Sequence, residues 1–226
     1  MGIGTRHITT STHKEWIVMN IIGYLGSPRR KGKCSRLLDK TLEGAASAGA
    51  AVKRVDLIRQ NIQHCMGCCK CMHDDPSREI GRCPLKDDMA ALLEDYIRAD
   101  GYVFASPVYD GSVTSLMKKF LERKLALSYR PQEAYATIGE ARCPAEFKKG
   151  AVMIVTGNCG EEYRELMGDP CFEIMEAHFM IEQVSTTDKL YVGGVENMPE
   201  EVLVEKEKAA FDAGVRLVAE IEKSRQ

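Results

Sequence analysis

The sequence predicts an α/β fold in which one parallel sheet is covered by helices on both faces. Short apolar runs alternate five times with segments of helical periodicity, which is the pattern of such a sheet. The first run, "WIVMNIIGY", is almost unbroken, and this is typical of a strand buried on both faces. The 226 residues contain neither a repeat nor a low-complexity linker, so we expect one domain over residues 16–226.

The first predicted unit is a strand, a helix and a second strand. The strand covers residues 16–24, and the helix follows as an apolar stripe over 35–49 that ends at Gly49. "AVKRVDL", residues 51–57, has the composition of a second strand.

The central part of the chain repeats this order after a cysteine-rich loop at residues 65–84. "KDDMAALLEDYIRA", residues 86–99, predicts a helix whose first acidic residues complement its N-terminal dipole. "GYVFASPVY", residues 101–109, predicts the third strand. Residues 112–123 carry apolar side chains at helical spacing and predict the next helix.

The last third of the chain predicts two more strands. "GAVMIVTG", residues 150–157, is the fourth, and a shorter fifth lies within 183–194. Between them, residues 161–180 predict a pair of helices that is broken at Gly168–Pro170. Residues 199–223 predict a terminal helix that starts with a proline.

Composition and charge exclude several classes of function. The net charge of −2 gives no reason to expect binding to nucleic acid or to a membrane surface, and no apolar run approaches membrane-spanning length. Residues 1–15 are polar and lack the apolar core of a secretory signal, so we expect a flexible N-terminal arm and a cytoplasmic protein. The irregular stretch 126–150 is long enough to be functional or to form a dimer contact.

The loop after the first strand, "GSPRRKGKCS", predicts an anion site. Glycines allow a tight turn, hydroxyls and amides gather at the start of a helix, and basic side chains add positive charge. The spacing matches neither the nucleoside-triphosphate nor the dinucleotide fingerprint. A phosphate is the ligand we expect, and a basic solvated turn is the alternative.

Two further loops follow strands that should end at the same edge of the sheet. "SPVYDGS" presents an apolar and aromatic edge after the third strand, although such an aromatic residue is also common in simple packing. "TGNCGEE" after the fourth strand contains glycines that permit close approach of a ligand to the backbone. Because ligands of open α/β sheets bind at the carboxyl ends of the strands, the three loops together predict a site for flavin mononucleotide (FMN).

Four motifs carry a resemblance to a known family. They are "GSPRRKGKCSRLL", C-x2-C-x2-C followed by "CPLKDDM", "ASPVYDGSVTSLMKKFLER" and "FKKGAVMIVTGN". In this order and spacing the chain resembles the NADPH-dependent FMN reductases, and in particular their iron–sulfur flavoprotein branch. The resemblance implies a flavodoxin-like three-layer α/β/α sandwich, with a five-stranded parallel sheet in the order 2-1-3-4-5.

The resemblance also implies the residues that bind FMN. The phosphate would be held by Ser27, Arg29, Lys33, Cys34 and Ser35; the isoalloxazine ring would be bordered by Pro107, Val108, Tyr109, Asp110 and Gly111; its pyrimidine side would face Thr156, Gly157 and Asn158. The chain departs from the family where Gly32-Lys33-Cys34 replaces Gly-Asn-Thr and where a carboxylate stands at position 110. A carboxylate near the flavin would lower its reduction potential, whereas one that points into solvent would not.

The cysteine loop predicts a redox or metal site, because clustered thiols in a reducing compartment seldom form disulfides. Cys65, Cys68 and Cys71 have the spacing of a ferredoxin-type run, and Cys83, which follows after a gap of eleven residues, precedes a proline. These four would bind a 4Fe-4S cluster, and Cys69 would be spare. In the iron–sulfur flavoproteins the fourth cysteine is usually nearer, so zinc and unloaded thiols are alternatives. Cys143, Cys159 and Cys171 are isolated and have no expected function.

These observations predict an FMN-dependent oxidoreductase. Electrons would come from NAD(P)H or from a reduced carrier such as ferredoxin, and would pass to a flavin, a quinone or another acceptor. No residue is assigned a catalytic role, because the flavin itself carries the chemistry. The contrasting hypothesis is an electron-transfer or redox-sensing protein without a small-molecule substrate. The resemblance further implies a homodimer or homotetramer.

Overall fold

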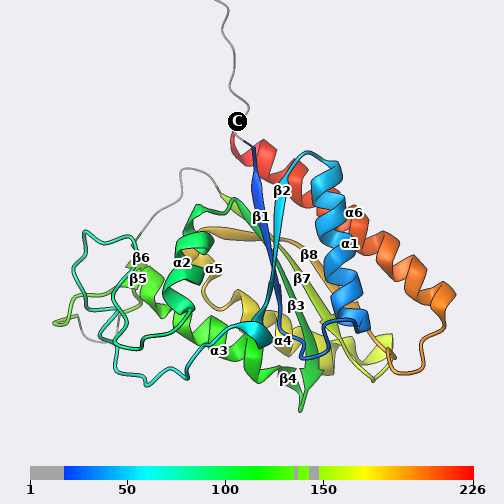
Figure 1. Cartoon of the computed structure of the whole chain (residues 1–226), viewed down its shortest axis with the longest axis horizontal. Helices are drawn as coiled ribbons and strands as arrows, with labels where there is room; N and C mark the ends of the chain where they lie inside the picture. The colour runs from blue at the N-terminus through cyan, green and yellow to red at the C-terminus, as the bar shows by residue number, and fades with distance from the viewer. Residues whose placement is uncertain (1–17, 135–136, 143–147) are drawn as a thin grey trace, which may run out of the picture.

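The computed structural model describes residues 18–134, 137–142 and 148–226 (Figure 1). The predicted arm at 1–15 and Cys143 lie outside the described residues. The main sheet has five parallel strands in the order β2-β1-β3-β7-β8. Counted along the chain, this is the predicted order 2-1-3-4-5, so the fold class is confirmed.

The parallel strands agree closely with the predicted ones, although the first begins at Asn20 and not before it. They are β1 (Asn20–Leu25), β2 (Ala51–Asp56), β3 (Gly101–Tyr109), β7 (Lys149–Thr156) and β8 (Val184–Val192). Three short strands were not predicted. β4 (Ser112–Val113) pairs antiparallel with the end of β3, while β5 (Ser128–Tyr129) and β6 (Glu140–Ala141) form a separate two-stranded sheet.

Helices cover both faces of the sheet (Figure 1). One face carries α1 (Lys33–Ser47) and α6 (Glu200–Ser224), and the other carries α2 (Met89–Arg98), α3 (Ser115–Arg123), α4 (Asp169–Glu176) and α5 (Phe179–Glu182). Short one-turn helices complete the chain: η1 (Leu57–Arg59), η2 (Lys124–Leu127), η3 (Glu161–Tyr163) and η4 (Arg164–Gly168). The last of these is a π-helix, and it replaces the first part of the predicted helix pair.

Alternation along the central strands divides the interior into two cores. In β3, Tyr102 and Phe104 belong to the core under α2 and α3, whereas Val103 and Ala105 belong to the core under α1 and α6. All four are fully buried. Because burial of a large apolar side chain contributes about 1.5–3 kcal/mol, the two cores fix the strand ends that carry the functional loops.

Two glycines allow α1 to pack closely against α6. A Cβ atom on Gly44 would lie 2.0 Å from the carbonyl oxygen of Phe211, and one on Gly214 would lie 2.0 Å from that of Thr41. Side chains at either position would therefore separate the helices. The close contact fixes the direction of α1 and hence the position of its N-terminus at the carboxyl edge of the sheet.

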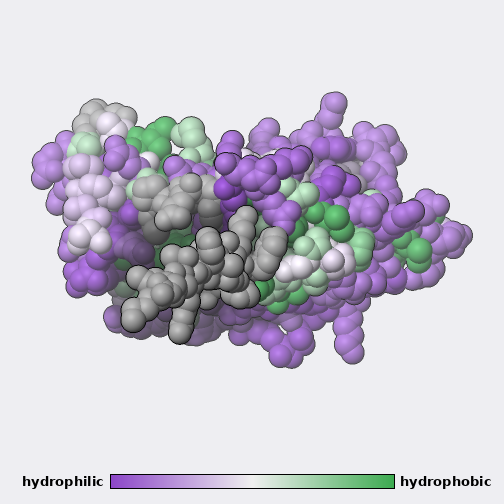
Figure 2. Space-filling view, turned by 90° about the horizontal axis from the view of Figure 1, so that it is seen from above, coloured by the Kyte–Doolittle hydropathy of each residue, from purple (hydrophilic) through white to green (hydrophobic). Residues whose placement is uncertain are grey.

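The surface in the view of Figure 2 is mostly hydrophilic, and hydrophobic residues gather only in limited areas between the polar ones. Among the helices that the structure describes, none is long and apolar enough to cross a membrane.

Candidate functional site

A pocket of about 690 Å³ opens at the carboxyl ends of β1, β3 and β7, and we call it the strand-end pocket. The loops that follow these three strands form its walls, as the order of the sheet predicts. Its lining includes every residue that the sequence suggested for FMN except Ser35: Ser27, Arg29, Lys33, Cys34, Pro107, Val108, Tyr109, Asp110, Gly111, Thr156, Gly157 and Asn158.

One corner of this pocket is the N-terminus of α1. The N-cap position is Gly32, which has no side chain to accept hydrogen bonds from the first amides of the helix. Ser27 is almost fully buried, and its hydroxyl accepts a hydrogen bond from the amide of Arg29 at 3.1 Å. Uncapped amides of a 15-residue helix beside a hydroxyl and a guanidinium suit a phosphate group.

Two of the predicted phosphate residues point elsewhere with their side chains. Ser35 is 1% exposed, and its hydroxyl donates to the carbonyl of Arg30 at 2.7 Å, so only its amide is available at the helix terminus. The ammonium of Lys33 donates to the carbonyls of Val195 and Glu196 in the loop after β8. Lys33 therefore supplies positive charge to the pocket while it anchors that loop.

The thiol of Cys34 forms part of the floor. It is 5% exposed, and burial raises the pKa of this thiol to about 12, against smaller opposing effects of a hydrogen bond with Thr156 and of the Arg54 charge. Cys34 is accordingly a neutral thiol at physiological pH.

The turn after β3 forms the opposite wall. β3 and β4 make a hairpin in which Tyr109 pairs with Ser112, and its two central residues, Asp110 and Gly111, both have positive φ, at 50° and 70°. Asp-Gly is a preferred pair for such a type I′ turn. Asp110 is exposed, and the turn itself accounts for its presence. Tyr109 is 47% exposed at the rim of the pocket.

Hydrogen bonds from α3 tie this turn to the loop after β1. Thr114 caps α3 by accepting from the amide of Met117 at 3.2 Å, and its hydroxyl donates to the carbonyl of Gly26 at 2.5 Å. The amide of Thr114 donates to the hydroxyl of Ser106 at 3.1 Å. The loop after β1 and the turn after β3 are thus held in a fixed relation.

The lining of the same pocket also includes Gly32 and Cys159, which lie in loops that the sequence singled out, and four residues that the sequence did not indicate: Met167, Tyr191, Val195 and Glu196. Tyr191 lies in β8, and its hydroxyl donates to the carbonyl of Cys159 at 3.1 Å. A Cβ atom on Gly157 would lie 2.7 Å from that hydroxyl, which explains the glycine. Met167, Tyr191, Val195 and Glu196 come from η4, β8 and the loop after β8, whose placement depends on tertiary packing and leaves no local motif.

A second hollow, the thiol pocket, lies under the cysteine loop. Its lining includes Cys65, Cys68, Cys69, Cys71 and Cys83, together with Pro84, Leu85, Leu125 and Arg123. Burial, and to a smaller extent the neighbouring Cys83, Cys65 and Cys68, raise the pKa of Cys71 to about 11. Cys83 therefore lies near the first three cysteines despite the eleven-residue gap. Within the part of the chain that the structure describes, no three His, Cys, Asp or Glu side chains lie close enough to hold a metal ion.

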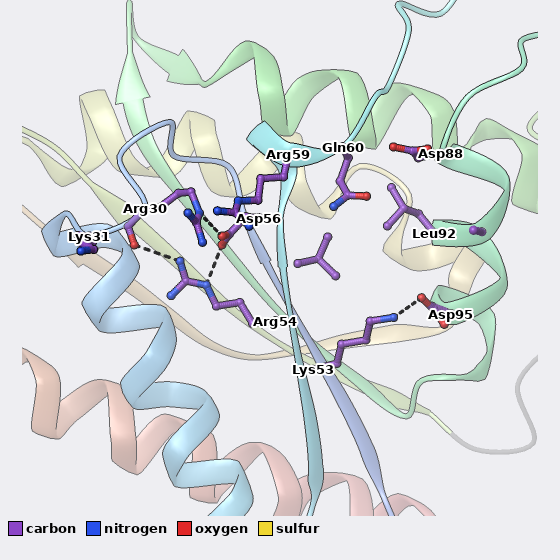
Figure 3. Close-up of a pocket in the computed structure, with 12 residues that line it drawn as sticks. Arg30, Lys31, Lys53, Arg54, Asp56, Arg59, Gln60, Asp88, Leu92 and Asp95 are labelled. Atoms are coloured by element: carbon purple, nitrogen blue, oxygen red, sulfur yellow. Dashed lines mark hydrogen bonds and ion pairs between the residues drawn. The ribbon is translucent and has the colours of Figure 1, made fainter.

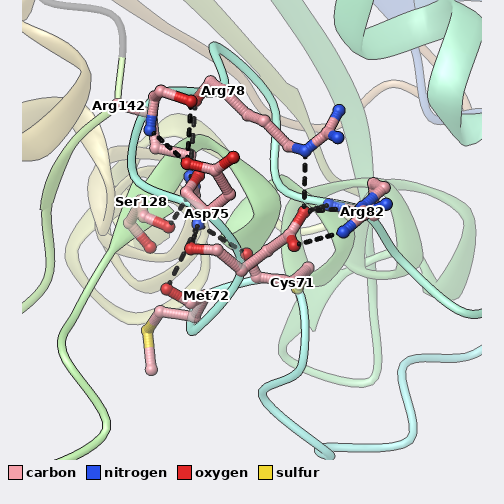
Figure 4. A network of polar contacts seen from close by, with 9 residues as sticks. Cys71, Met72, Asp75, Arg78, Arg82, Ser128 and Arg142 are labelled. Carbon is pink, nitrogen blue, oxygen red and sulfur yellow. Dashed lines mark hydrogen bonds and ion pairs between the residues drawn. The ribbon is translucent and has the colours of Figure 1, made fainter.

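Arg142 organises the backbone of the cysteine loop (Figure 4). This residue is 9% exposed and comes from the end of β6, about seventy positions along the chain. Its guanidinium donates to six carbonyl oxygens: those of Cys71 (2.9 Å), Met72 (3.3 Å), Asp74 (3.1 Å), Asp75 (2.7 Å), Arg78 (3.3 Å) and Ser128 (3.0 Å). One buried guanidinium thus supplies hydrogen bonds to carbonyl groups that are paired within regular secondary structure elsewhere.

The segment that carries Arg142 contacts the loop elsewhere as well. The amide of Gly81 donates to the carbonyl of Ala126 at 2.8 Å, and a Cβ atom at position 81 would lie 1.9 Å from the carbonyl oxygen of Cys71. His73 bonds through Nδ1 to the carbonyl of Arg130 at 2.7 Å. The described part of the 126–150 stretch is therefore a brace for the cysteine loop. Its expected role as a dimer contact stays a prediction.

A further hollow of about 870 Å³ lies beside β2, next to the loop that carries Arg30 (Figure 3). Arg30 and Arg54 both bind Asp56, and Lys53 pairs with Asp95 at 2.6 Å. Burial alone would raise the pKa of Asp56, but hydrogen bonds from the two arginines lower it. Arg30 thus faces this groove, whereas its neighbour Arg29 faces the strand-end pocket.

Comparison with known sequences identifies the family. Residues 19–160 match the family described as NADPH-dependent FMN reductase. The chain belongs to this family. An iron-sulfur flavoprotein of Archaeoglobus fulgidus is 36% identical over 113 residues, which cover 50% of this chain and 49% of the relative. An iron-sulfur flavoprotein of Methanocaldococcus jannaschii is 33% identical over 109 residues, covering 48% and 53%. The chain thus spans about half the length of the curated relatives it matches.

Solved structures of other proteins share the fold. An NAD(P)H:quinone oxidoreductase from Methanothermobacter marburgensis superimposes with a TM-score of 0.67 at 20% identity, over 88% of this chain and 96% of the other. A flavone reductase superimposes with a TM-score of 0.66 at 16% identity, over 92% and 65%. At these identities the likeness establishes the flavodoxin-like architecture and nothing finer.

Proposed function

We propose that this protein is an FMN-dependent oxidoreductase that takes electrons from NAD(P)H or from a reduced carrier and passes them to a flavin, a quinone or another acceptor. The observation that carries the proposal is the strand-end pocket, in which an uncapped helix N-terminus and two strand-end loops face one space. Membership of the FMN reductase family supports it.

The residues of the strand-end pocket suit the parts of FMN. The amides at the start of α1, with Ser27 and Arg29, would hold the phosphate, because they offer donors and positive charge. The turn at 107–111 and the loop at 156–158 would border the ring system. Bound FMN would supply the redox chemistry, since its ring accepts a hydride or electrons. The protein would position the ring and shield its buried side from water.

An iron–sulfur cluster in the thiol pocket would be a second cofactor, and its binding would draw together thiols that are too far apart in the described residues to hold a metal ion. Cys65, Cys68, Cys71 and Cys83 would be its ligands, because four thiolates are the donor set of such clusters and all four line one small, mostly apolar hollow. The relatives named iron-sulfur flavoproteins support this assignment. Cys69 lines the same hollow, with its backbone at a positive φ of 52°, and would remain outside the ligand set.

Anaerobic purification followed by absorption spectroscopy tests both cofactors. We expect flavin bands and about four irons and four sulfides per chain. The variant Cys68→Ser/Cys71→Ser should lose the iron and keep the flavin, while Cys171→Ser, which removes a buried thiol outside the loop, should keep both. Flavin without iron in a sample never exposed to oxygen would reject the cluster. One equivalent of zinc per chain would indicate a zinc site in its place.

Turnover assays test the reaction. We expect oxidation of NADPH or NADH when free FMN or a quinone is supplied as acceptor. A protein that holds flavin but oxidises neither nicotinamide would contradict the reductase and would indicate an electron carrier or sensor. Light scattering of the loaded protein tests the proposed homodimer or homotetramer.

A further inference from the structure

Arg123, the last residue of α3, lies at the edge of the thiol pocket and is almost fully buried. Its side chain is 3% exposed, and that of its partner Asp87 is 1% exposed. The two groups form a bidentate pair, with distances of 2.6 Å from Nη1 to Oδ2 and 3.1 Å from Nη2 to Oδ1. A buried pair of this kind compensates its own charges, so the carboxylate alone would satisfy the guanidinium electrostatically.

The remaining donors of Arg123 reach both ends of the cysteine loop. Nη1 donates to the carbonyl of Gln63 at 3.0 Å, just before Cys65, and Nη2 donates to the Sγ atom of Cys83 at 3.5 Å. Asp87 adds bonds from the amides of Gln63 and Met89, at 2.8 and 3.1 Å. Arg123 and Asp87 therefore close the loop where it leaves and rejoins the domain.

The contact with sulfur distinguishes this arginine from a purely structural one. A neutral thiol is a weak hydrogen-bond acceptor, whereas a thiolate bound to metal is a strong one. The hydrogen bond from the guanidinium to Cys83 is therefore strongest when this cysteine is a metal-bound thiolate. The contact also helps to explain how a cysteine that eleven residues separate from the others reaches the same pocket: α3 holds it there, together with contacts inside the loop such as the hydrogen bonds from Arg82 to Asp74.

We propose that Arg123 is the positioning residue that fixes Cys83 as the fourth thiolate ligand of the iron–sulfur cluster and donates a hydrogen bond to its sulfur. The inference rests on the proposed function of the thiol pocket. It also gives α3 a double role. Its first turn follows Thr114, which ties the two walls of the strand-end pocket, and nine residues later, about 14 Å along the axis, Arg123 binds Cys83.

Two variants separate the hydrogen bond from the charge. Arg123→Lys keeps the charge but cannot serve Asp87, Gln63 and Cys83 together, and Arg123→Gln removes the charge as well. The matched control is Lys118→Gln, an exposed change on the same helix, where Lys118 pairs with Glu122. For all three and the wild type we would measure iron and sulfide per chain, FMN per chain and the reduction potential of the cluster.

We expect both Arg123 variants to keep FMN and to bind the cluster on the order of 10- to 100-fold more weakly, as is usual for loss of a group that orients a metal ligand. The cluster that remains should have a lower reduction potential, and the fall should be greater in Arg123→Gln, because a hydrogen bond to sulfur and a positive charge both favour the reduced cluster. Wild-type iron content and potential in Arg123→Gln would overturn the inference. Parallel loss of iron and FMN would also overturn it, because it would show a general structural role.

A second measurement uses the iron-free protein. We would follow alkylation of each cysteine by mass spectrometry, with exposed Cys68 as the internal reference. Release from α3 should make Cys83 react at least about threefold faster relative to Cys68 in Arg123→Lys, since local order limits access. An unchanged ratio would reject the positioning role. A wild type that never takes up iron would instead reject the proposed cluster, so the two failures can be told apart.

Discussion

The strand-end pocket and the thiol pocket are built in opposite ways. The first is assembled from strand ends and a helix terminus, so regular backbone places its residues. The second lies under a loop of irregular backbone, which two buried arginines from distant parts of the chain hold in shape. The comparison teaches that a site on regular elements tolerates changes of single side chains, whereas a loop site depends on a few of them.

The largest expected effect is that of Arg142→Met on the thiol pocket. The change leaves six carbonyl groups without their donor, and we expect the free energy of unfolding to fall by at least about 3 kcal/mol. Cluster binding should be lost while FMN binding survives at temperatures where the domain stays folded. Denaturant unfolding and iron analysis measure both. Arg78→Met, an exposed change in the same loop, is the control. Retention of iron in Arg142→Met would show that the loop holds its shape without the arginine.

The same contrast explains what the sequence could and could not predict. Apolar runs and helical periodicity were enough for the strands and helices themselves, whereas the order of the strands came from the family resemblance. That order placed residues such as Ser27, Tyr109 and Gly157 at one edge of the sheet. The roles of Arg123 and Arg142 could not be predicted, because their partners lie tens of residues away and are mostly backbone carbonyls. Every residue has a backbone carbonyl, so the sequence does not indicate which of them accepts a hydrogen bond from a distant arginine.

The next largest effect is expected in the strand-end pocket at the N-terminus of α1, where the phosphate of FMN would bind. We expect Arg29→Ala to weaken FMN binding about tenfold, since a charge-assisted hydrogen bond to phosphate contributes about 1.5 kcal/mol or more. Arg30→Ala is the matched control, because Arg30 faces the neighbouring groove and binds Asp56 (Figure 3). Fluorescence titration with FMN gives both dissociation constants. Equal losses in the two variants would show that the basic loop acts only through its total charge.

A smaller effect should appear at alkaline pH through Cys34. The pKa of this buried thiol is raised to about 12 in the folded protein, against about 8.5 for an unfolded cysteine. The folded state therefore keeps a proton that the unfolded state loses, so stability falls as the pH rises from 8.5 towards 12.

Between pH 8.5 and 9.5 Cys34 should account for about 1 kcal/mol of lost stability. Urea unfolding of reduced, FMN-free protein at both pH values should show this much less loss in Cys34→Ser. Cys68→Ser, which removes an exposed thiol, should behave as the wild type. If Cys34→Ser follows the wild type as well, the thiol is not the group that titrates, and the floor of the strand-end pocket is more accessible to water than its burial indicates.

The smallest effect is expected at Asp110. In this turn, either the backbone geometry or the charge of the side chain could explain the residue. If backbone geometry explains this residue, Asp110→Asn should change the free energy of unfolding by less than about 0.5 kcal/mol and leave the flavin potential unchanged, because asparagine also accepts positive φ. Asp110→Val should cost about 1–2 kcal/mol, since a β-branched residue is strained at a φ of 50°. Potentiometric titration of the flavin and denaturant unfolding distinguish the outcomes. A higher flavin potential in Asp110→Asn would mean that the carboxylate acts on the ring by its charge, and that this wall depends on a side chain as the thiol pocket does.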